Sequence, residues 1–200
     1  MTPESLRGQL SGAAERWLAG ALARVETDPA AIRTLFPAAG RACGRDPLPE
    51  PPGWTVDDAV RVLLLAALPL TGEPLSAEAA DLYRYGGPAE KRAVLRGLAL
   101  LPIGDAGLPL VRDALRTNDT RLISAALGPY AATHLDPPAW RHGVLKCVFT
   151  GIPLSEIDGL DRRLDAELVR MLRSFAEERA AAGRDVPADV YHLVPDLREL

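Results

Sequence analysis

Apolar residues recur with the spacing of an α-helix along nearly the whole chain. Close to the N-terminus this spacing is kept by Leu6, Leu10, Ala14 and Leu18, and later segments repeat it. The segments are separated by prolines and glycines. Strict alternation and Asn-Gly turns, which mark strands and hairpins, are absent from the sequence. The pattern therefore predicts an all-α protein with negligible β-sheet.

The positions of proline and glycine predict where the helices begin and end. Gly86 and Gly87 end one helix, and Pro88 suits the first turn of the next because its missing N–H costs nothing there. The Pro-rich segment 44–54 is the clear loop. The predicted helices cover approximately 3–26, 29–42, 55–69, 76–86, 88–101, 106–117, 119–135, 138–151, 155–182 and 187–193.

Helix pairs joined by short turns recur from 76 to 151, about every 30 residues. This organisation is typical of an α-solenoid, a right-handed superhelix of antiparallel pairs that is HEAT-like by geometry. The tetratricopeptide signature and the other named repeat patterns are absent from the sequence. We expect one helical domain over 1–200.

Composition argues against several classes of protein. The chain is 48% hydrophobic with a net charge of −4, which is ordinary for a folded domain and disfavours nucleic-acid binding. The most apolar segment, 62–70, is much shorter than the ~20 residues that cross a bilayer. We expect a cytoplasmic protein, and peripheral contact with the inner membrane stays open.

The cysteines and histidines do not form a recognisable metal or disulfide pattern. Cys43 and Cys147 are far apart in sequence, so we expect two reduced thiols, Cys147 buried and Cys43 easier to label. The three histidines lack the spacing of an HExxH zinc site. No metal site and no cofactor are predicted.

The segment 115–153 contains the main candidate site. Tyr130 and His134 lie four residues apart on one predicted helix, and His142 and Lys146 lie four apart on the next. A short proline turn at 136–138 would pair these helices, so we expect the four side chains to line one cavity.

Lys146 needs a partner, because burying an unpaired ammonium costs several kcal/mol. Tyr130, Asp119, Glu90 or a bound anion could supply it. On this interpretation Lys146→Met leaves stability unchanged or higher and abolishes ligand binding. The competing interpretation is that His142 and Lys146 form an ordinary solvated stripe.

Three further groups are weaker candidates for ligand contact. Asn118, Asp119 and Arg121 lie between two predicted helices, where capping is the simpler role. An aromatic helix end could stack on a ligand or pack on its neighbour; it consists of Tyr83, Arg84 and Tyr85. A phosphate could be bound by the third group, which consists of Arg33, Arg41 and Arg45; the alternative is that these are ordinary exposed arginines.

Four long blocks of the sequence closely resemble the EboA family of bacterial proteins. The blocks are "RTLFPAAGRACGR", "DLYRYGGPAEKRAVLRGLALLP", "LRTNDTRLISAALGPYAATHLDPPAWRHGVLKCVFTGIP" and "FAEERAAAGR". The similarity spans Arg33 to Pro187. It implies a role in making or moving a specialised metabolite, beside a UbiA-type prenyltransferase, a sugar-phosphate-cyclase-like enzyme and metal-dependent hydrolases.

The resemblance supplies no catalytic residues, only positions within matching blocks. Those positions are Tyr83, Arg84, Tyr85, Lys91, Asn118, Asp119, Arg121, Tyr130, His134, Trp140, Lys146 and Cys147. They are the candidate ligand-binding and catalytic residues, together with His142.

Two functions follow from these observations. The first is a noncatalytic helical module that binds a pathway intermediate or docks pathway enzymes, including a membrane prenyltransferase. The alternative is a small enzyme acting on a phosphorylated, cyclitol-like or prenylated intermediate. In it, His134 or His142 would be the acid or base, Lys146 the electrostatic stabiliser and Tyr130 the proton donor. The first is favoured, because no GxSxG, P-loop or GxGxxG motif is present.

Overall fold

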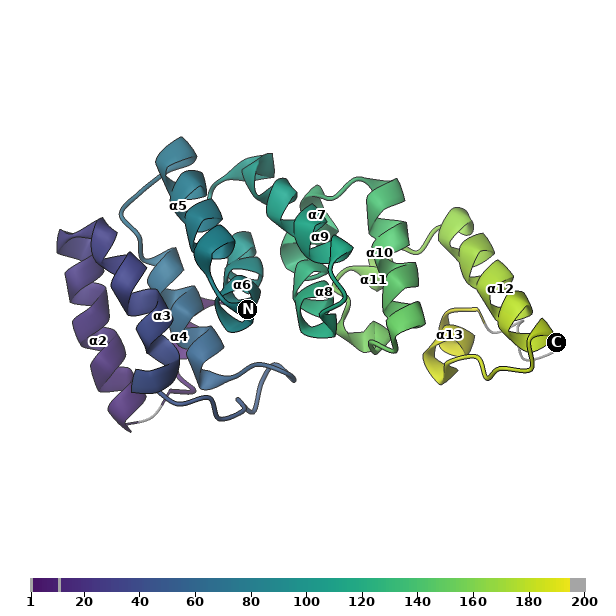
Figure 1. The fold of residues 1–200 in the computed structure, drawn as a ribbon, viewed down its shortest axis with the longest axis horizontal. Helices are drawn as coiled ribbons and strands as arrows, with labels where there is room; N and C mark the ends of the chain where they lie inside the picture. Colours follow the sequence, from purple (N-terminus) through teal and green to yellow (C-terminus); the bar gives the residue numbers. More distant parts are fainter. Residues whose placement is uncertain (1, 11, 195–200) are drawn as a thin grey trace. The chain divides into compact units, whose positions relative to one another are not determined.

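The described chain is built mainly of helices joined by loops and turns (Figure 1). A computed structural model describes residues 2–10 and 12–194. Within them there is no strand, and a single isolated bridge pairs Pro47 with Thr55. The all-α prediction is confirmed.

Most of the described residues lie in α-helices joined by short connections. The α-helices are α1 (Pro3–Arg7), α2 (Gly12–Thr27), α3 (Ile32–Ala42), α4 (Val56–Ala66), α5 (Gly72–Tyr85), α6 (Pro88–Gly97), α7 (Leu108–Arg116), α8 (Thr120–Ala126), α9 (Pro129–His134), α10 (Pro137–Thr150), α11 (Leu160–Arg163), α12 (Ala166–Ala181) and α13 (Ala188–Leu193). The 3-10 helices are η1 (Pro29–Ala31), η2 (Leu98–Leu100), η3 (Gly104–Gly107) and η4 (Leu154–Glu156).

The chain divides into two compact units, one ending at Leu110 and the other beginning at Val111. In the first unit α4 is central and packs against α1, α2, α3 and α6. In the second unit α10 packs against α8, η4 and α12. The two candidate cavities described below each lie within one unit.

Several helix starts are built as the sequence predicts. Pro88 and Pro137 occupy first-turn positions, where no N–H is required. Asp136 accepts a hydrogen bond from the N–H of Ala139, and Asp119 accepts one from the N–H of Arg121. The prediction that Asp119 caps a helix is confirmed, since α8 begins at the next residue.

Three predicted helices are wrong in extent, because each is interrupted. The predicted helix 3–26 is divided between α1 and α2, with Gly8 as the C-cap of α1. The predicted helix 119–135 breaks into α8 and α9, because Pro129 cannot donate to the preceding turn and starts a new helix. The segment 155–182 contains η4, α11 and α12, with Gly159 at φ 74° between the first two.

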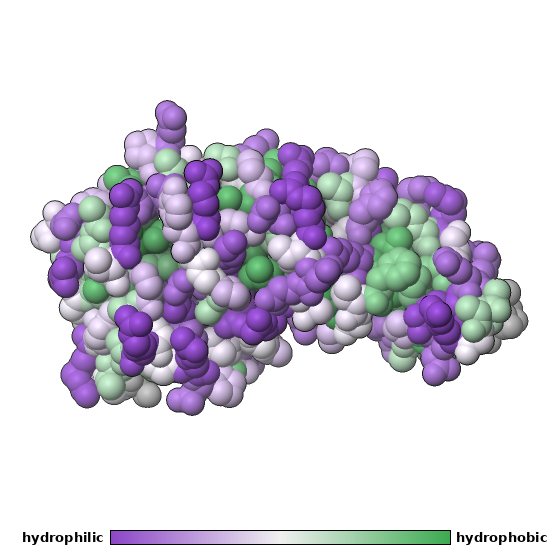
Figure 2. Space-filling model, viewed as in Figure 1, coloured by the Kyte–Doolittle hydropathy of each residue, from purple (hydrophilic) through white to green (hydrophobic). Residues whose placement is uncertain are grey.

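The core of each unit is apolar with a few informative exceptions. In α4 every residue from Asp57 to Leu65 is buried, including three charged ones. In the second unit Gly143 allows α10 to approach α8, because a Cβ there would lie 2.9 Å from Leu127 Cδ2. Figure 2 shows apolar residues in scattered patches among hydrophilic ones on the visible face. No described helix has both the length and the hydropathy needed to cross a membrane.

The two thiols are expected to differ in reactivity. Both are free, Cys147 is fully buried, and burial raises its pKa to about 12, so at neutral pH it is a protonated thiol. Cys43 is only partly buried. This burial raises its pKa, and the negative charge of Asp57 raises it further. An aromatic disulfide reagent should modify one thiol per native chain, and Cys43→Ser should remove that reaction. Equal reaction of native Cys147 would contradict the prediction.

Candidate functional site

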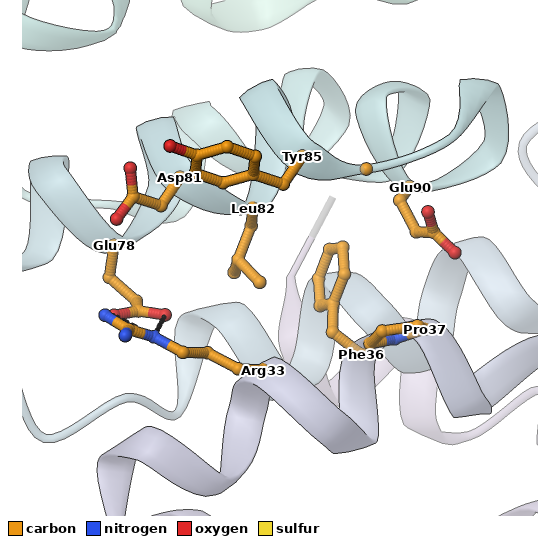
Figure 3. A pocket seen from close by; sticks show the side chains of 9 residues that line it. Arg33, Phe36, Pro37, Glu78, Asp81, Leu82, Tyr85 and Glu90 are labelled. Carbon is orange, nitrogen blue, oxygen red and sulfur yellow. Dashed lines mark hydrogen bonds and ion pairs between the residues drawn. The ribbon is translucent and has the colours of Figure 1, made fainter.

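A cavity of about 280 Å³ in the first unit is one candidate site (Figure 3). Helices α3 and α5 and the start of α6 supply its walls. The lining residues are Arg33, Phe36, Pro37, Glu78, Asp81, Leu82, Tyr85, Gly86 and Glu90. Those of α5 follow the i, i+3, i+4, i+7 spacing of one helical face.

Part of the cavity wall is apolar. Figure 3 shows Leu82 of α5 and Phe36 of α3 pointing toward one another, with Pro37 beside Phe36. Tyr85 also belongs to the lining, yet its side chain is 78% exposed. An exposed tyrosine at the mouth of a cavity offers an aromatic face to a ligand.

The polar part of the lining is acidic. Arg33 donates to Glu78 through Nε (2.9 Å) and Nη2 (2.7 Å), and this pairing raises the pKa of the guanidinium. Asp81 and Glu90 add two more carboxyl groups. The lining therefore contains one guanidinium, which is paired with Glu78, and three carboxylates, so the cavity favours hydroxyl or ammonium donors and disfavours anions.

The joint between α5 and α6 holds one end of the cavity in place. At Gly86 a Cβ would lie 2.5 Å from the carbonyl oxygen of Leu82, so a side chain does not fit there. Glu90 accepts a hydrogen bond from the N–H of Gly87 and thereby caps α6. The same carboxylate lines the cavity.

Behind the cavity lies a buried ionic network centred on Arg61 of α4, which is 1% exposed. Its Nε donates to the carbonyl oxygen of Phe36 at 2.9 Å, its Nη1 pairs with Asp57, and its Nη2 lies 3.8 Å from Glu90 Oε1. Arg61 therefore connects α4 to one cavity residue on α3 and to another on α6.

Asp57 and Asp58 complete this network. Burial raises the pKa of Asp57, but the hydroxyl of Thr55 and the guanidinium of Arg61 lower it by more, so the carboxyl stays ionised. Asp58, with no exposed surface, accepts from Thr55 and pairs with Arg92 and Arg96.

The same network fixes the Pro-rich loop. Arg96 donates to the carbonyl oxygen of Gly53 at 3.0 Å, and its guanidinium carbon lies 4.7 Å from the ring centroid of Trp54. We did not predict this network. Its signal was available in the sequence, because "VDDAVR" places three charges at the start of an otherwise apolar helix.

Two of the four residues predicted to share a cavity in the second unit contact each other. Tyr130 is buried and stacks on His134 with ring centroids 4.5 Å apart. His142 is exposed, and its Nδ1 lies 2.7 Å from the carbonyl oxygen of Pro138.

Lys146 has partners that the sequence did not reveal. Its Nζ donates to the carbonyl oxygens of Leu115 (2.7 Å) and Thr117 (2.6 Å) at the end of α7. The prediction that Tyr130, Asp119 or Glu90 is the partner of Lys146 is therefore wrong. A cation at a helix C-terminus satisfies unpaired carbonyls and complements the helix dipole, which is a structural role.

The other predicted ligand residues divide between packing and exposure. Tyr83 is buried with Lys91 Nζ 5.0 Å from its ring centroid, whereas Arg84 is exposed. Asn118 is exposed, and Arg121 pairs with Asp119 at 2.8 Å. Within residues 2–10 and 12–194 no cluster of three or more His, Cys, Asp or Glu could hold a metal ion.

Comparison with known proteins places the chain in a family. Comparison with curated proteins and with solved structures gave no match. A family model described as "Metabolite traffic protein EboA" matches residues 8–195, nearly the whole chain. This span contains the cavity of the first unit and the ionic network behind it. The chain therefore belongs to the EboA family.

Proposed function

We propose that this protein is a noncatalytic binding component of metabolite traffic, and that a small metabolite occupies the cavity between α3, α5 and α6. The observation that carries the proposal is a cavity of about 280 Å³ whose walls combine apolar side chains with an acidic lining. Ligand sites are typically concave, largely apolar and provided with a few fixed polar groups.

The lining defines the chemistry of the expected ligand. An apolar or flat portion would pack against Phe36, Leu82 and Tyr85. Hydroxyl or ammonium groups would donate to Asp81 and Glu90, since carboxylates accept and do not donate when ionised. A phosphorylated ligand is disfavoured in this cavity by repulsion from the carboxylates.

The buried network supports a preorganised site. Arg61 holds the backbone of Phe36 and lies close to Glu90, so an apolar wall and a polar wall share one anchor. A cavity whose walls are already fixed loses less conformational entropy when the ligand binds. We assign the network this positioning role.

The wider role rests on the family. The proposal includes a HEAT-like solenoid arrangement, a cytoplasmic location with contact at the inner membrane, and docking of pathway enzymes such as a membrane prenyltransferase. The pathway is that of a specialised metabolite. The enzymatic alternative is weakened by the contacts of Lys146, whose ammonium is engaged by two carbonyl oxygens.

Tyr85→Ala is expected to weaken retention of the small molecule about 5- to 30-fold, the effect of losing ~1–2 kcal/mol of stacking. Because Tyr85 is exposed, the melting temperature should stay within about 1–2 °C. Native mass spectrometry of protein purified from its producing cells measures the retained mass.

Phe149→Ala is the matched control, because Phe149 is also an exposed aromatic residue, at 61%, and lies in the second unit. It should leave retention unchanged. Leu82→Trp, which fills the cavity, should abolish retention. A retained molecule that is indifferent to both Tyr85→Ala and Leu82→Trp would show that the ligand lies elsewhere.

A further inference from the structure

A second cavity, in the second unit, has the opposite charge. It measures about 240 Å³ and lies between the start of α10 and the segment that joins α11 to α12. Its lining residues are Pro137, Trp140, Arg141, Arg162, Arg163, Leu164 and Asp165. Three guanidinium groups therefore share this small space with one carboxylate.

Two of the guanidinium groups are held rigidly. Arg141 donates to Asp165 through Nε and Nη2, at 3.0 and 2.6 Å. Arg163 donates to the carbonyl oxygens of Ala131 (2.8 Å) and Leu135 (2.7 Å), near the end of α9.

Arg163 and Trp140 add two signs of an incomplete site. The guanidinium carbon of Arg163 lies 4.7 Å from the ring centroid of Trp140. Burial lowers the pKa of Arg163, and the positive charge of Arg141 adds to this, while the carboxylates of Asp136 and Asp165 act in the opposite direction. Trp140 is 1% exposed, and its Nε1–H has no acceptor among the described residues, which is costly for a buried donor.

We propose that this cavity binds a phosphate group, free or as part of a larger molecule. Arginine forks match the oxygens of a phosphate, and the group would neutralise charges that repel one another. Arg162 would close the site from its exposed side. Its side chain is 67% exposed, and its hydrogen bond to Asp158 is long, at 3.3 Å, so the guanidinium is free to turn toward a ligand. The proposal is independent of the acidic cavity, whose lining would repel the same group.

Titration calorimetry of the full chain with inorganic pyrophosphate tests the proposal. Arg162→Gln should weaken binding about tenfold, because it removes one charge-assisted hydrogen bond to the phosphate. A higher concentration of sodium chloride should also weaken the binding of pyrophosphate to the unmodified chain, because salt screens the electrostatic attraction. Stability should change little, because Arg162 is exposed.

Arg170→Gln is the matched control. Arg170 is 66% exposed and pairs with a neighbouring carboxylate, Glu167, but it does not line the cavity. The Arg170→Gln variant should bind pyrophosphate as tightly as the unmodified chain does. Co-sedimentation with phosphatidylglycerol vesicles tells a lipid headgroup from a soluble phosphate, and Arg162→Gln should reduce whichever binding is found. Absence of binding in both assays, or equal losses in Arg162→Gln and Arg170→Gln, would overturn the proposal.

Discussion

Replacing Asp58 with asparagine should lower the free energy of unfolding by about 3–5 kcal/mol, the cost of breaking a buried ion pair from one side. Asp58 has no exposed surface and is paired with Arg92 and Arg96, which are 15% and 11% exposed. Asparagine keeps the shape but loses the charge, so two largely buried guanidinium groups lose their counter-ion. Chemical denaturation followed by circular dichroism measures the change.

Asp46→Asn is the control for this measurement, because Asp46 is exposed and belongs to the same unit. It should change the free energy of unfolding by no more than ~0.5 kcal/mol. Equal effects of the two substitutions would mean that Arg92 and Arg96 reach water easily, and that the network does not hold the Pro-rich loop.

The expected size of this effect bears on what the network does. A buried ion pair contributes little net stability compared with apolar residues of the same shape, yet removing one partner is expensive. Such a network is therefore better explained by the geometry it imposes than by the stability it adds. Here it joins Arg61 to Phe36 and Glu90, two walls of the acidic cavity.

The helices were predictable to a useful degree, because their causes are local. Apolar spacing with proline and glycine joints indicated α3, α6 and α10 nearly as they are. The break before Pro129 was missed, because the apolar pattern continues through Leu127 into Tyr130 and hides the lost hydrogen bond. The spacing of apolar residues indicates which side of a helix is buried, but it does not show where one helix ends and another begins with a different axis.

The acidic cavity was less predictable, because it depends on contacts between distant segments. Arg33 and Glu78 are 45 residues apart, and nothing local indicates that they pair. The face of Glu78, Asp81, Leu82 and Tyr85 does have helical spacing, so its mixture of acid and apolar residues was a usable signal. Only Tyr85 of that face was among the candidates.

Lys146→Met is expected to lower the free energy of unfolding by about 2–3 kcal/mol. The sequence alone led to the opposite expectation, because it showed that an ammonium in apolar surroundings needs a partner but not which one. The partners are the carbonyl oxygens of Leu115 and Thr117, a type of acceptor that every residue carries. Methionine would leave these carbonyls at the end of α7 without their donor.

His142→Met is the matched control, because it places the same side chain four residues earlier on α10, at an exposed position. It should cost no more than ~0.5 kcal/mol in the same denaturation experiment. If Lys146→Met instead leaves stability unchanged and removes a bound metabolite, the ammonium serves a ligand and the contacts with α7 are incidental. If Lys146→Met destabilises the protein while its remaining folded fraction still retains the metabolite, Lys146 stabilises the fold and the ligand site lies elsewhere.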